Sequence, residues 1–464
     1  MGKFYKSASE LKPHQQRVID KLRNEDSILV YHGVGSGKTL TALEAGEQLN
    51  LPMDIIGPAA LKSNFAKEKA KHHVKVPFKY FSYNKPPAAS EVNSGNKLLV
   101  FDEAHNMGRM ESARSHYPDQ YYGNKTMFLT GTPLRNSPDE LIPLMRGLGV
   151  AVPRDRQRFN NLFVEEIVKK PSFLAATMLG VKPGTIKVPR NLELFKKLLE
   201  DKVDYYKPES ADYPSVSEST KIVEMSDRQF DTYKEMMKGN PGLAYKVKHG
   251  LPPDKSEASS LNAFLNASRQ ISNTPKAFNL SSTEEDEPKF NAAVSEIKKR
   301  VTMDKNYRGV TYSNYIESGV NPMARRLSRE NISFGEFTGK SSDKEKKQII
   351  EDYNSGKIKQ LLISGAGSEG LDLKGTKLLQ VLEPHWNDPK IDQVIGRAVR
   401  YQSHVDLPEN ERHVEIQKFI ALPRKHGFFV KKRDTGADEY LSMLSKQKSN
   451  LNNAFLNALQ EVGS

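Results

Sequence analysis

SILVYHGVGSGKTLTALEAGEQL, residues 27–49, is the stretch that decides the fold. It begins with a short apolar run at residues 27–31, which is typical of a buried strand in a parallel sheet. The glycine-rich HGVGSGKT follows at residues 32–39, and a helical stretch comes directly after it. A phosphate-binding loop requires this order, because the loop amides and the positive end of the new helix then face the phosphate oxygens. The sequence therefore predicts an α/β fold with a nucleotide site at the end of its first strand.

The residue types in this loop suit the phosphates of a nucleotide. The glycines let the backbone turn sharply and aim its N–H groups at phosphate oxygens. We expect the lysine to reach the β- and γ-phosphates of ATP and the threonine to hold Mg²⁺ through its hydroxyl. The residues expected to contact the nucleotide or its metal are Gly33, Gly35, Ser36, Gly37, Lys38 and Thr39. The first loop position, where glycine or alanine is usual, is His32.

A second apolar run, at residues 97–101, ends in the acidic stretch Asp102-Glu103-Ala104-His105. Ligands of open α/β sheets bind at the carboxyl ends of the strands. We therefore expect Asp102 to contact Mg²⁺ and Glu103 to orient and deprotonate the attacking water. His105 has two possible roles, coupling the ATP state to the interface between lobes or simple packing, and the sequence does not choose between them.

QVIGRAVR, residues 393–400, is the third motif with a chemical meaning. If the stretch is helical, residues three apart share a face, so Arg397 and Arg400 should direct their guanidinium groups at one target. A planar group that is always charged suits a transferring phosphoryl group. The alternative is a basic surface helix, and the two motifs upstream argue against it.

Composition sets limits on the class of protein. The 464 residues are too many for one ordinary core and should form two or three domains. A formal net charge of +13 suits a polyanionic partner, and it serves solubility equally well. The absence of cysteine excludes disulfides and cysteine-based zinc sites and favours a reducing compartment. No apolar run approaches the length of a transmembrane helix, and the N-terminus lacks the apolar core of a secretory signal, so no membrane partner is expected.

Strand and helix patterns divide the chain into segments. Residues 1–150 alternate strand candidates with helical stretches and predict a parallel-sheet lobe, and residues 301–424 return to the same pattern. Residues 151–300 predict a helical insertion, with a solvated linker at residues 281–288. Residues 425–464 predict a helical tail that packs on the second lobe. The strand candidates are residues 28–31, 53–56, 98–101, 126–129, 310–312, 360–363 and 378–382.

Taken together, the motifs resemble those of superfamily 2 helicase-like ATPases of the Snf2 type. LKPHQ at residues 11–15 resembles their Q-motif, in which the glutamine reads the adenine edge, and QVIGRAVR resembles their motif VI. GPAALKSNFAKE from residue 57 resembles motif Ia, and LTGTPLRNSPDEL from residue 129 resembles motif III. FTGKSSDKEKKQIIEDYNSG from residue 337 and LLISGAGSEGLDL from residue 361 resemble motifs IVa and V. Order and spacing agree over most of the chain.

This resemblance implies two RecA-like lobes with ATP in the cleft. It implies further ATP-site residues, which are Gln15, Gly370, Asp372, Gln393, Arg397 and Arg400. It also implies nucleic-acid contacts at Pro58, Thr130, Gly131, Thr338, Gly339 and Ser364. Trp386, the only tryptophan, lies just before motif VI, and we expect it to pack within its loop rather than stack on a base.

A narrower resemblance rests on two stretches, residues 204–215 (DYYKPESADYPS) and residues 383–404. Both are similar to Snf2-related ATPases of large cytoplasmic DNA viruses, a group that includes the poxvirus nucleoside triphosphatase I and early transcription factor small subunit. The resemblance implies a place in the host cytoplasm or the virion, with a viral RNA polymerase or transcription factor subunit as partner.

Three functions follow from these motifs. The first is a DNA-dependent ATPase that translocates on duplex DNA during viral transcription. The second is a strand-separating helicase acting on RNA or DNA, which needs a wedge that the sequence does not reveal. The third is a non-catalytic DNA-binding scaffold, against which the intact Lys38, Glu103 and Arg400 argue. The sequence leaves open the direction of movement, the protein partner and the oligomeric state.

Overall fold

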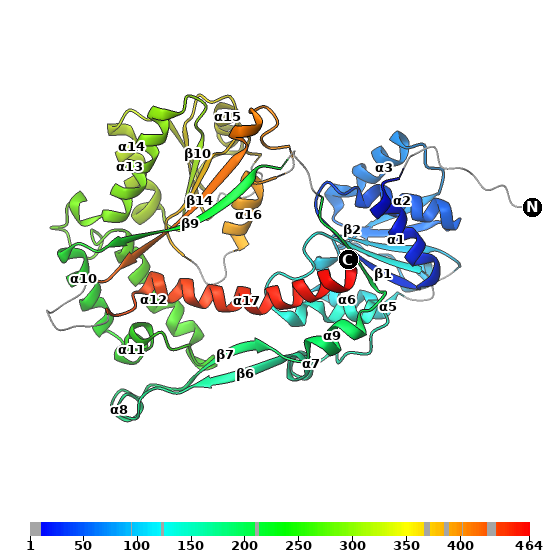
Figure 1. Cartoon of the computed structure of the whole chain (residues 1–464), viewed down its shortest axis with the longest axis horizontal. Coiled ribbons are helices and arrows are strands. Elements are labelled where there is room, and N and C mark those ends of the chain that lie inside the picture. Colours follow the sequence, from blue (N-terminus) through cyan, green and yellow to red (C-terminus); the bar gives the residue numbers. More distant parts are fainter. Residues whose placement is uncertain are drawn as a thin grey trace, which may run out of the picture. The chain divides into compact units, whose positions relative to one another are not determined.

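The computed structural model describes residues 11–93, 95–121, 125–208, 213–365, 372–384, 389–400, 402–424 and 433–464. The chain divides into two compact units. Unit 1 comprises Met1–Glu166, Lys187–Glu209 and Lys448–Ser464, and unit 2 comprises Ile167–Ile186 and Ser210–Gln447. Each unit is built around one six-stranded sheet whose paired strands all run parallel (Figure 1). The expected α/β class with two RecA-like parallel-sheet lobes is confirmed.

The sheet of unit 1 has the strand order β3-β2-β4-β5-β1-β8. Its strands are β1 (Ser27–His32), β2 (Met53–Gly57), β3 (Phe78–Ser82), β4 (Leu98–Asp102), β5 (Lys125–Thr130) and β8 (Val203–Tyr206). Its longer helices are α1 (Pro13–Asn24), α2 (Lys38–Leu49), α3 (Lys62–Lys71), α7 (Arg156–Phe163) and α9 (Leu192–Leu198). The four expected strands are present, and the edge strands β3 and β8 are additions.

Both faces of this sheet are covered, which explains the continuous apolar runs. In β1, Ile28 and Val30 join one buried cluster, whereas Leu29 and Tyr31 join the other. Successive strand side chains point to opposite faces, so a strand covered on both sides needs apolar residues throughout. Because all the strands are parallel, their carboxyl ends share one edge, and the phosphate loop and the acidic stretch both begin there.

The sheet of unit 2 has the order β11-β12-β10-β13-β14-β9. Its strands are β9 (Ser215–Glu224), β10 (Gly309–Ser313), β11 (Phe334–Phe337), β12 (Gln360–Ser364), β13 (Leu378–Val381) and β14 (His413–Leu422). Its main helices are α10 (Asp227–Lys238), α11 (Pro241–His249), α12 (Ala258–Asn273), α13 (Pro288–Met303), α14 (Asn321–Arg329), α15 (Asp343–Asn354) and α16 (Pro389–Ala398). The edge strand β9 pairs with β14 over ten residues, and the two run side by side in Figure 1.

Residues 151–300 differ from the helical insertion that the sequence suggested. They contain strands as well as helices, and they are divided between the two units. The strand β8 extends the sheet of unit 1, and β9 extends the sheet of unit 2. The strands β6 (Val164–Lys169) and β7 (Gly184–Pro189) form a separate two-stranded sheet with the short helix α8 (Phe173–Met178) between them. The parallel pairing of β8 and β9 at the sheet edges, which joins residues far apart in the chain, accounts for part of the difference.

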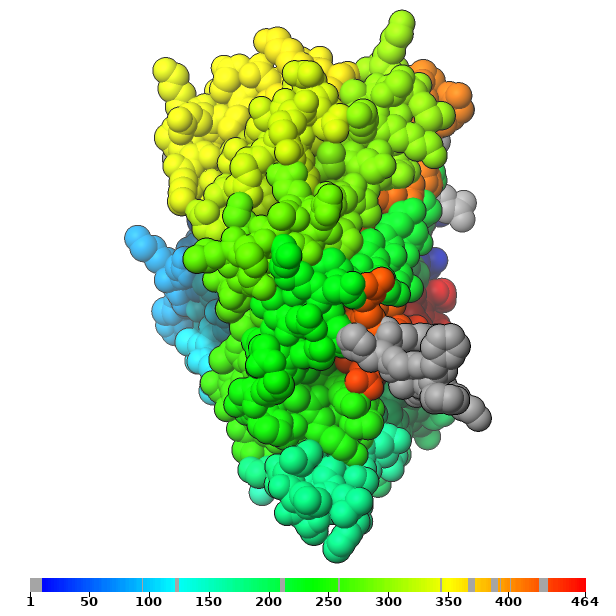
Figure 2. Space-filling view, turned by 90° about the vertical axis from the view of Figure 1, so that its left-hand side faces the viewer, coloured from blue at the N-terminus to red at the C-terminus, as the bar shows by residue number. Residues whose placement is uncertain are grey.

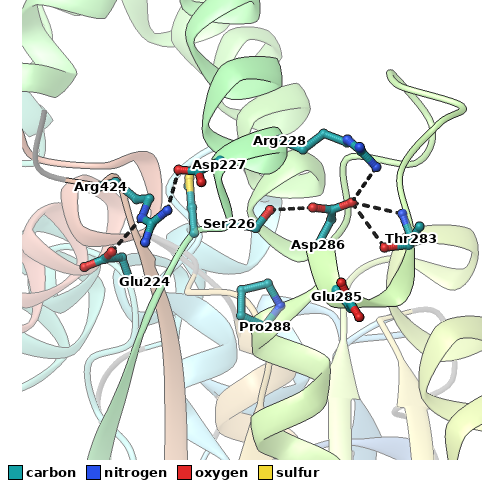
Figure 3. A pocket seen from close by; sticks show the side chains of 10 residues that line it. Glu224, Ser226, Asp227, Arg228, Thr283, Glu285, Asp286, Pro288 and Arg424 are labelled. Carbon is teal, nitrogen blue, oxygen red and sulfur yellow. Dashed lines mark hydrogen bonds and ion pairs between the residues drawn. The ribbon is translucent and has the colours of Figure 1, made fainter.

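The prediction of a solvated linker at residues 281–288 is wrong. Asp286 is buried and accepts hydrogen bonds from Ser226 Oγ at 2.9 Å and from the Thr283 amide at 3.0 Å. It also forms an ion pair with Arg228 at 3.3 Å. These residues line a polar pocket of about 620 Å³ at the start of α10 (Figure 3). A stretch rich in Asp and Glu reads as solvated from composition, but here its carboxylates cap helices and pair with arginine.

The C-terminal helix α17 (Ala437–Gly463) accounts for most of the expected helical tail. Residues before Lys448 belong to unit 2, where Tyr440 joins the apolar cluster around α10 to α12. The later residues enter the core of unit 1, where the Phe455 ring meets Phe195 edge-on with 5.1 Å between the ring centroids. The expected packing on the second lobe therefore holds only for the first turns of the helix. Among the described residues, no helix is both long enough and apolar enough to cross a bilayer.

Removing the Phe455 side chain should destabilise unit 1. Phe455 is fully buried, and Phe455→Ala should lower the free energy of unfolding by about 3–5 kcal/mol, because a cavity remains in the core. Thermal unfolding followed by circular dichroism measures the effect. Asn457→Ala, an exposed position on the same helix, is the control and should shift the midpoint little. Equal midpoints for the two variants would contradict the packing described above.

Candidate nucleotide-binding site

The phosphate loop connects β1 to α2 at the carboxyl edge of the unit 1 sheet. Gly37 has a φ of 81°, and a Cβ there would lie 2.5 Å from Gln15 Nε2, so only glycine fits. The Ser36 side chain is buried, and its Oγ has no hydrogen-bond partner among the described residues. A buried hydroxyl normally has a partner. The loop therefore fits an anionic ligand that brings acceptor oxygens.

Lys38, the first residue of α2, folds back over the loop. Its Nζ donates to the carbonyl oxygens of His32 at 2.9 Å and Gly33 at 3.2 Å. Burial lowers the pKa of Lys38, whereas the charges of Glu103 and Asp102 raise it. A Cβ at Gly131 would lie 3.9 Å from Lys38 Nζ and 3.3 Å from the His32 carbonyl oxygen. The glycine expected in motif III therefore lies against the phosphate loop.

Asp102 and Glu103 lie at the end of β4, as the sequence predicted. Burial, and then the neighbouring charge of Glu103, raise the pKa of Asp102 to about 6. Glu103 has a φ of 51°. Residues other than glycine rarely adopt this backbone conformation, and it is often found at functional sites. No cluster of three or more metal-ligating side chains occurs in the described ranges. Mg²⁺ bound with nucleotide phosphates needs only one or two protein ligands, so Thr39 and Asp102 fit this role.

His105 connects the acidic pair to the end of β5. Its Nδ1 lies 2.9 Å from Thr130 Oγ1 and 3.3 Å from Glu103 Oε2, and its Nε2 lies 2.5 Å from an Arg135 nitrogen. Arginine can only donate, so Nε2 accepts and Nδ1 carries the proton that Thr130 or Glu103 receives. Burial, and then the charges of Arg135 and Lys38, lower the pKa of His105 to about 3, so the ring is neutral. His105 therefore contacts both the acidic pair and the end of β5.

Arg135 is a residue that sequence reasoning missed. It lies in the stretch TGTPLRN that carried the motif III resemblance, and its position alone gave no sign of a role. Only the fold places it against His105, 30 residues away in the chain.

Gln15 lies beside the phosphate loop, near the start of α1. Its Oε1 accepts from the Lys12 amide at 2.9 Å, and its Nε2 donates to the Gly37 carbonyl oxygen at 3.3 Å. The side chain is thus engaged with the loop, at the position from which the resemblance expects it to reach the adenine. Pro58 follows β2 at the same edge of the sheet, and its carbonyl oxygen accepts from the Tyr80 hydroxyl at 2.8 Å.

In unit 2, Arg400 and Asp372 form an ion pair. The helix α16 ends at Ala398, so Arg397 lies on the helix and Arg400 lies just beyond its end. The chain then turns, with the Ser403 amide donating to the Arg400 carbonyl oxygen at 3.1 Å. Arg397 is exposed near the end of α16. Gly370, Trp386 and the side chain of Gln393 lie outside the described residues.

The expected nucleic-acid residues of unit 2 also meet at a sheet edge. Phe337 of β11 pairs with Ile363 of β12, so Thr338 and Ser364, the next residues in each strand direction, lie beside one another. Both are buried, and Gly339 is exposed. The Ser364 Oγ has no hydrogen-bond partner within the described ranges of the chain.

The sequence profile of the SNF2-related domain matches residues 30–277, and that of the helicase conserved C-terminal domain matches residues 289–402. The first match covers more than half of the chain, so the protein belongs to the SNF2-related family. It is a helicase-like, nucleic-acid-dependent ATPase.

Similar proteins come from large DNA viruses. A putative ATP-dependent RNA helicase of Acanthamoeba polyphaga mimivirus is 35% identical over 96% of this chain and 95% of its own length. A termination factor NPH-I homolog of African swine fever virus is 26% identical over 96% of this chain and 77% of its own. The nucleoside triphosphatase I of Choristoneura fumiferana entomopoxvirus is 22% identical over 95% and 76%.

Lys38 and Glu103 should affect ATP hydrolysis for different reasons. Lys38→Ala removes the positive charge that is expected to contact the phosphates, so both ATP affinity and turnover should fall. Glu103→Gln keeps the shape and removes the base, so ATP should still bind while turnover falls about 10²–10⁴-fold. Steady-state ATPase kinetics with a separate binding measurement distinguish the two. Glu193→Gln, at an exposed carboxylate of α9, is the control. Near-normal turnover in Glu103→Gln would contradict the assignment of Glu103 as the base.

Arg135 should affect turnover through the ring of His105. Arg135→Gln removes the guanidinium that fixes the tautomer, so Nδ1 no longer donates reliably toward Glu103 and Thr130. We expect kcat to fall on the order of 10-fold, the size typical of a lost supporting hydrogen bond, with little change in the KM for ATP. Arg158→Gln, at an exposed arginine of α7, should behave as wild type. A change in KM alone would argue against this mechanism.

Proposed function

We propose that the protein is an ATP-driven motor that translocates on duplex DNA during viral transcription. The observation that carries the proposal is the link from Glu103 through His105 to Thr130. Glu103 is the proposed base for hydrolysis. Motif III, in which Gly131 is partly exposed and Thr130 is fully buried, is the proposed contact with the nucleic acid. A contact path between these two functions, with His105 Nδ1 lying 2.9 Å from Thr130 Oγ1 and 3.3 Å from Glu103 Oε2, is what a motor needs and a scaffold does not.

In the proposed reaction, ATP places its phosphates on the amides of the loop and beside Lys38. Glu103 accepts a proton from the water that attacks the γ-phosphorus, and the bond from that phosphorus to the β-phosphate oxygen breaks so that ADP leaves. Lys38 stabilises the charge that develops on the γ-phosphate. Bound Mg²⁺, held by Thr39 and Asp102, would neutralise charge on the phosphate oxygens. We assign Arg397 and Arg400 to the same phosphoryl group on the strength of motif VI, with Asp372 orienting Arg400 through their ion pair.

The protein should bind nucleic acid through the sugar-phosphate backbone. The net charge of +13 suits phosphate contacts, and Thr338, Gly339 and Ser364 lie together at one edge of the unit 2 sheet. Contacts of this kind are insensitive to base sequence. We assign a viral RNA polymerase or transcription factor subunit as protein partner, because a similar protein of African swine fever virus is described as a termination factor homolog.

A second function, strand separation, is favoured by one structural feature. Between β6 and β7, the helix α8 exposes large apolar side chains, with Phe173 80%, Leu174 66% and Met178 77% exposed. In Figure 2 this helix and the residues beside it project from the surface of unit 2. Exposed apolar clusters mark interaction sites, and a projecting aromatic tip could separate paired strands. We rank this second, because the motif spacing is Snf2-like.

The two functions differ in a paired assay. On duplex DNA carrying a triplex-forming third strand, the wild-type protein should displace that strand with ATP, whereas Glu103→Gln should not. Thr130→Ala should hydrolyse ATP but displace less strand for each ATP consumed. A forked duplex should give little unwound product, and Phe173→Ser should leave triplex displacement unchanged. Efficient fork unwinding that is lost in Phe173→Ser, with no triplex displacement, would transfer the assignment to the helicase.

A further inference from the structure

A buried carboxylate on β8 lies beside the phosphate loop. Asp204 is fully buried and accepts hydrogen bonds from Arg17 Nε at 2.7 Å and from His32 Nε2 at 2.7 Å. The ammonium of Lys21 lies 3.1 Å away. His32 is the first residue of the loop, and the chain separates it from Asp204 by 172 residues.

The charges of this cluster follow from its contacts. Burial alone would raise the pKa of Asp204, but the hydrogen bonds from His32 and Arg17 and the charge of Lys21 outweigh it and lower the pKa to about 2. Burial lowers the pKa of His32, so its ring is neutral at pH 7. An ionised carboxylate can only accept, so the proton of the neutral His32 ring is on Nε2 and is donated to Asp204. A hydrogen bond to a charged acceptor is stronger than one between neutral groups.

Two more contacts hold the loop against β8 and α1. The Gly33 amide donates to the Tyr206 carbonyl oxygen at 2.9 Å, and a Cβ at Gly33 would lie 2.8 Å from Pro208 Cδ. The Tyr206 ring stacks on His14, with 3.6 Å between centroids and 7° between the planes. His14 Nε2 in turn lies 2.9 Å from the Ser36 carbonyl oxygen. The loop is therefore held at its first, second and fifth residues.

We propose that Asp204 is a positioning residue for the phosphate loop, acting through His32, and that β8 belongs to the nucleotide site. A loop with three glycines has many backbone conformations, and holding one of them before ATP arrives lowers the entropy lost on binding. The proposal also explains why the first loop position carries histidine where a smaller residue is usual. It rests on the proposed ATP site and does not depend on the nucleic-acid track.

A purely structural role makes a different prediction. If Asp204 only ties α1 to the sheet through Arg17 and Lys21, then removing the Arg17–Asp204 contact should weaken ATP binding as much as removing the His32–Asp204 contact. Arg17 is 42% exposed at its side chain and contacts Asp204 from the side of α1, so it can be changed without touching the loop. Arg17→Met is therefore the matched control for the variants that remove the His32–Asp204 hydrogen bond.

The test compares nucleotide binding and turnover in the full-length chain. Affinity for a non-hydrolysable ATP analogue is measured by calorimetry, and KM and kcat by ATPase assay. In Asp204→Asn the dissociation constant and KM should rise about tenfold, the size expected for losing a hydrogen bond to a charged group, with kcat within about threefold of wild type. Arg17→Met should lower thermal stability but keep the affinity close to wild type.

A double-mutant cycle then isolates the path through His32. His32→Gly should weaken binding as Asp204→Asn does, and the double variant should be no weaker than either single one, because both break one interaction. His32→Gln, which keeps a donor of similar reach, should restore most of the affinity. Additive effects, or equal loss of affinity in Arg17→Met, would overturn the proposal.

Two further outcomes are also decisive. If Asp204→Asn does not fold, the comparison of His32→Gly with His32→Gln carries the test, and equal affinities in these two variants would overturn the proposal. Since analogue binding needs neither DNA nor movement, failure of the translocation assay leaves this comparison intact. Wild-type protein that hydrolyses ATP without displacing a third strand would thus refute the motor and not the positioning role.

Discussion

Parallel pairing of β1 with β5 on one side and β8 on the other is the constraint on which the site of unit 1 depends. The register sets Tyr31 opposite both Thr130 and Tyr205, so the three strands end at the same level. The phosphate loop therefore leaves β1 between motif III and the end of β8. A slip of one residue in either pair would turn every side chain to the other face and separate these groups. Backbone hydrogen bonds thus place the chemistry before any side chain contributes.

Buried ionisable side chains lie on two sides of the phosphate loop, and their surroundings differ. On one side, Lys38 lies near Asp102 and Glu103, and burial perturbs the pKa of Lys38 downward and that of Asp102 upward, to about 6. Perturbed pKa values of this kind are common at functional sites, where a bound ligand changes the local charge. On the other side, Asp204 has a complete set of donors and stays ionised. The first arrangement suits binding and reaction, and the second suits rigidity.

Unit 2 is also built on a parallel sheet, and its expected functional residues lie at strand and helix ends. Its sheet also collects polar residues at the carboxyl ends of parallel strands, among them Thr338 and Ser364. The arginines of motif VI are not equivalent, because Arg397 lies within α16 and Arg400 lies beyond its end, paired with Asp372. The helix end separates two residues that spacing alone would place on one face.

The sequence by itself determined the local elements of this protein. The apolar runs of β1, β2, β4 and β5, the glycine loop ending in Lys38 and Thr39, and the acidic pair at Asp102 all have short-range signatures in hydrophobic period and turn chemistry. The motif order also indicated the family that the SNF2-related profile confirms. Only the tertiary structure decided the edge strand β8, the pairing of β9 with β14, the Arg135–His105 contact and the Asp204–His32 pair. Each joins residues 30 to about 200 positions apart, and contacts of that range leave no periodic trace in the chain, because they exist only once the sheets have formed.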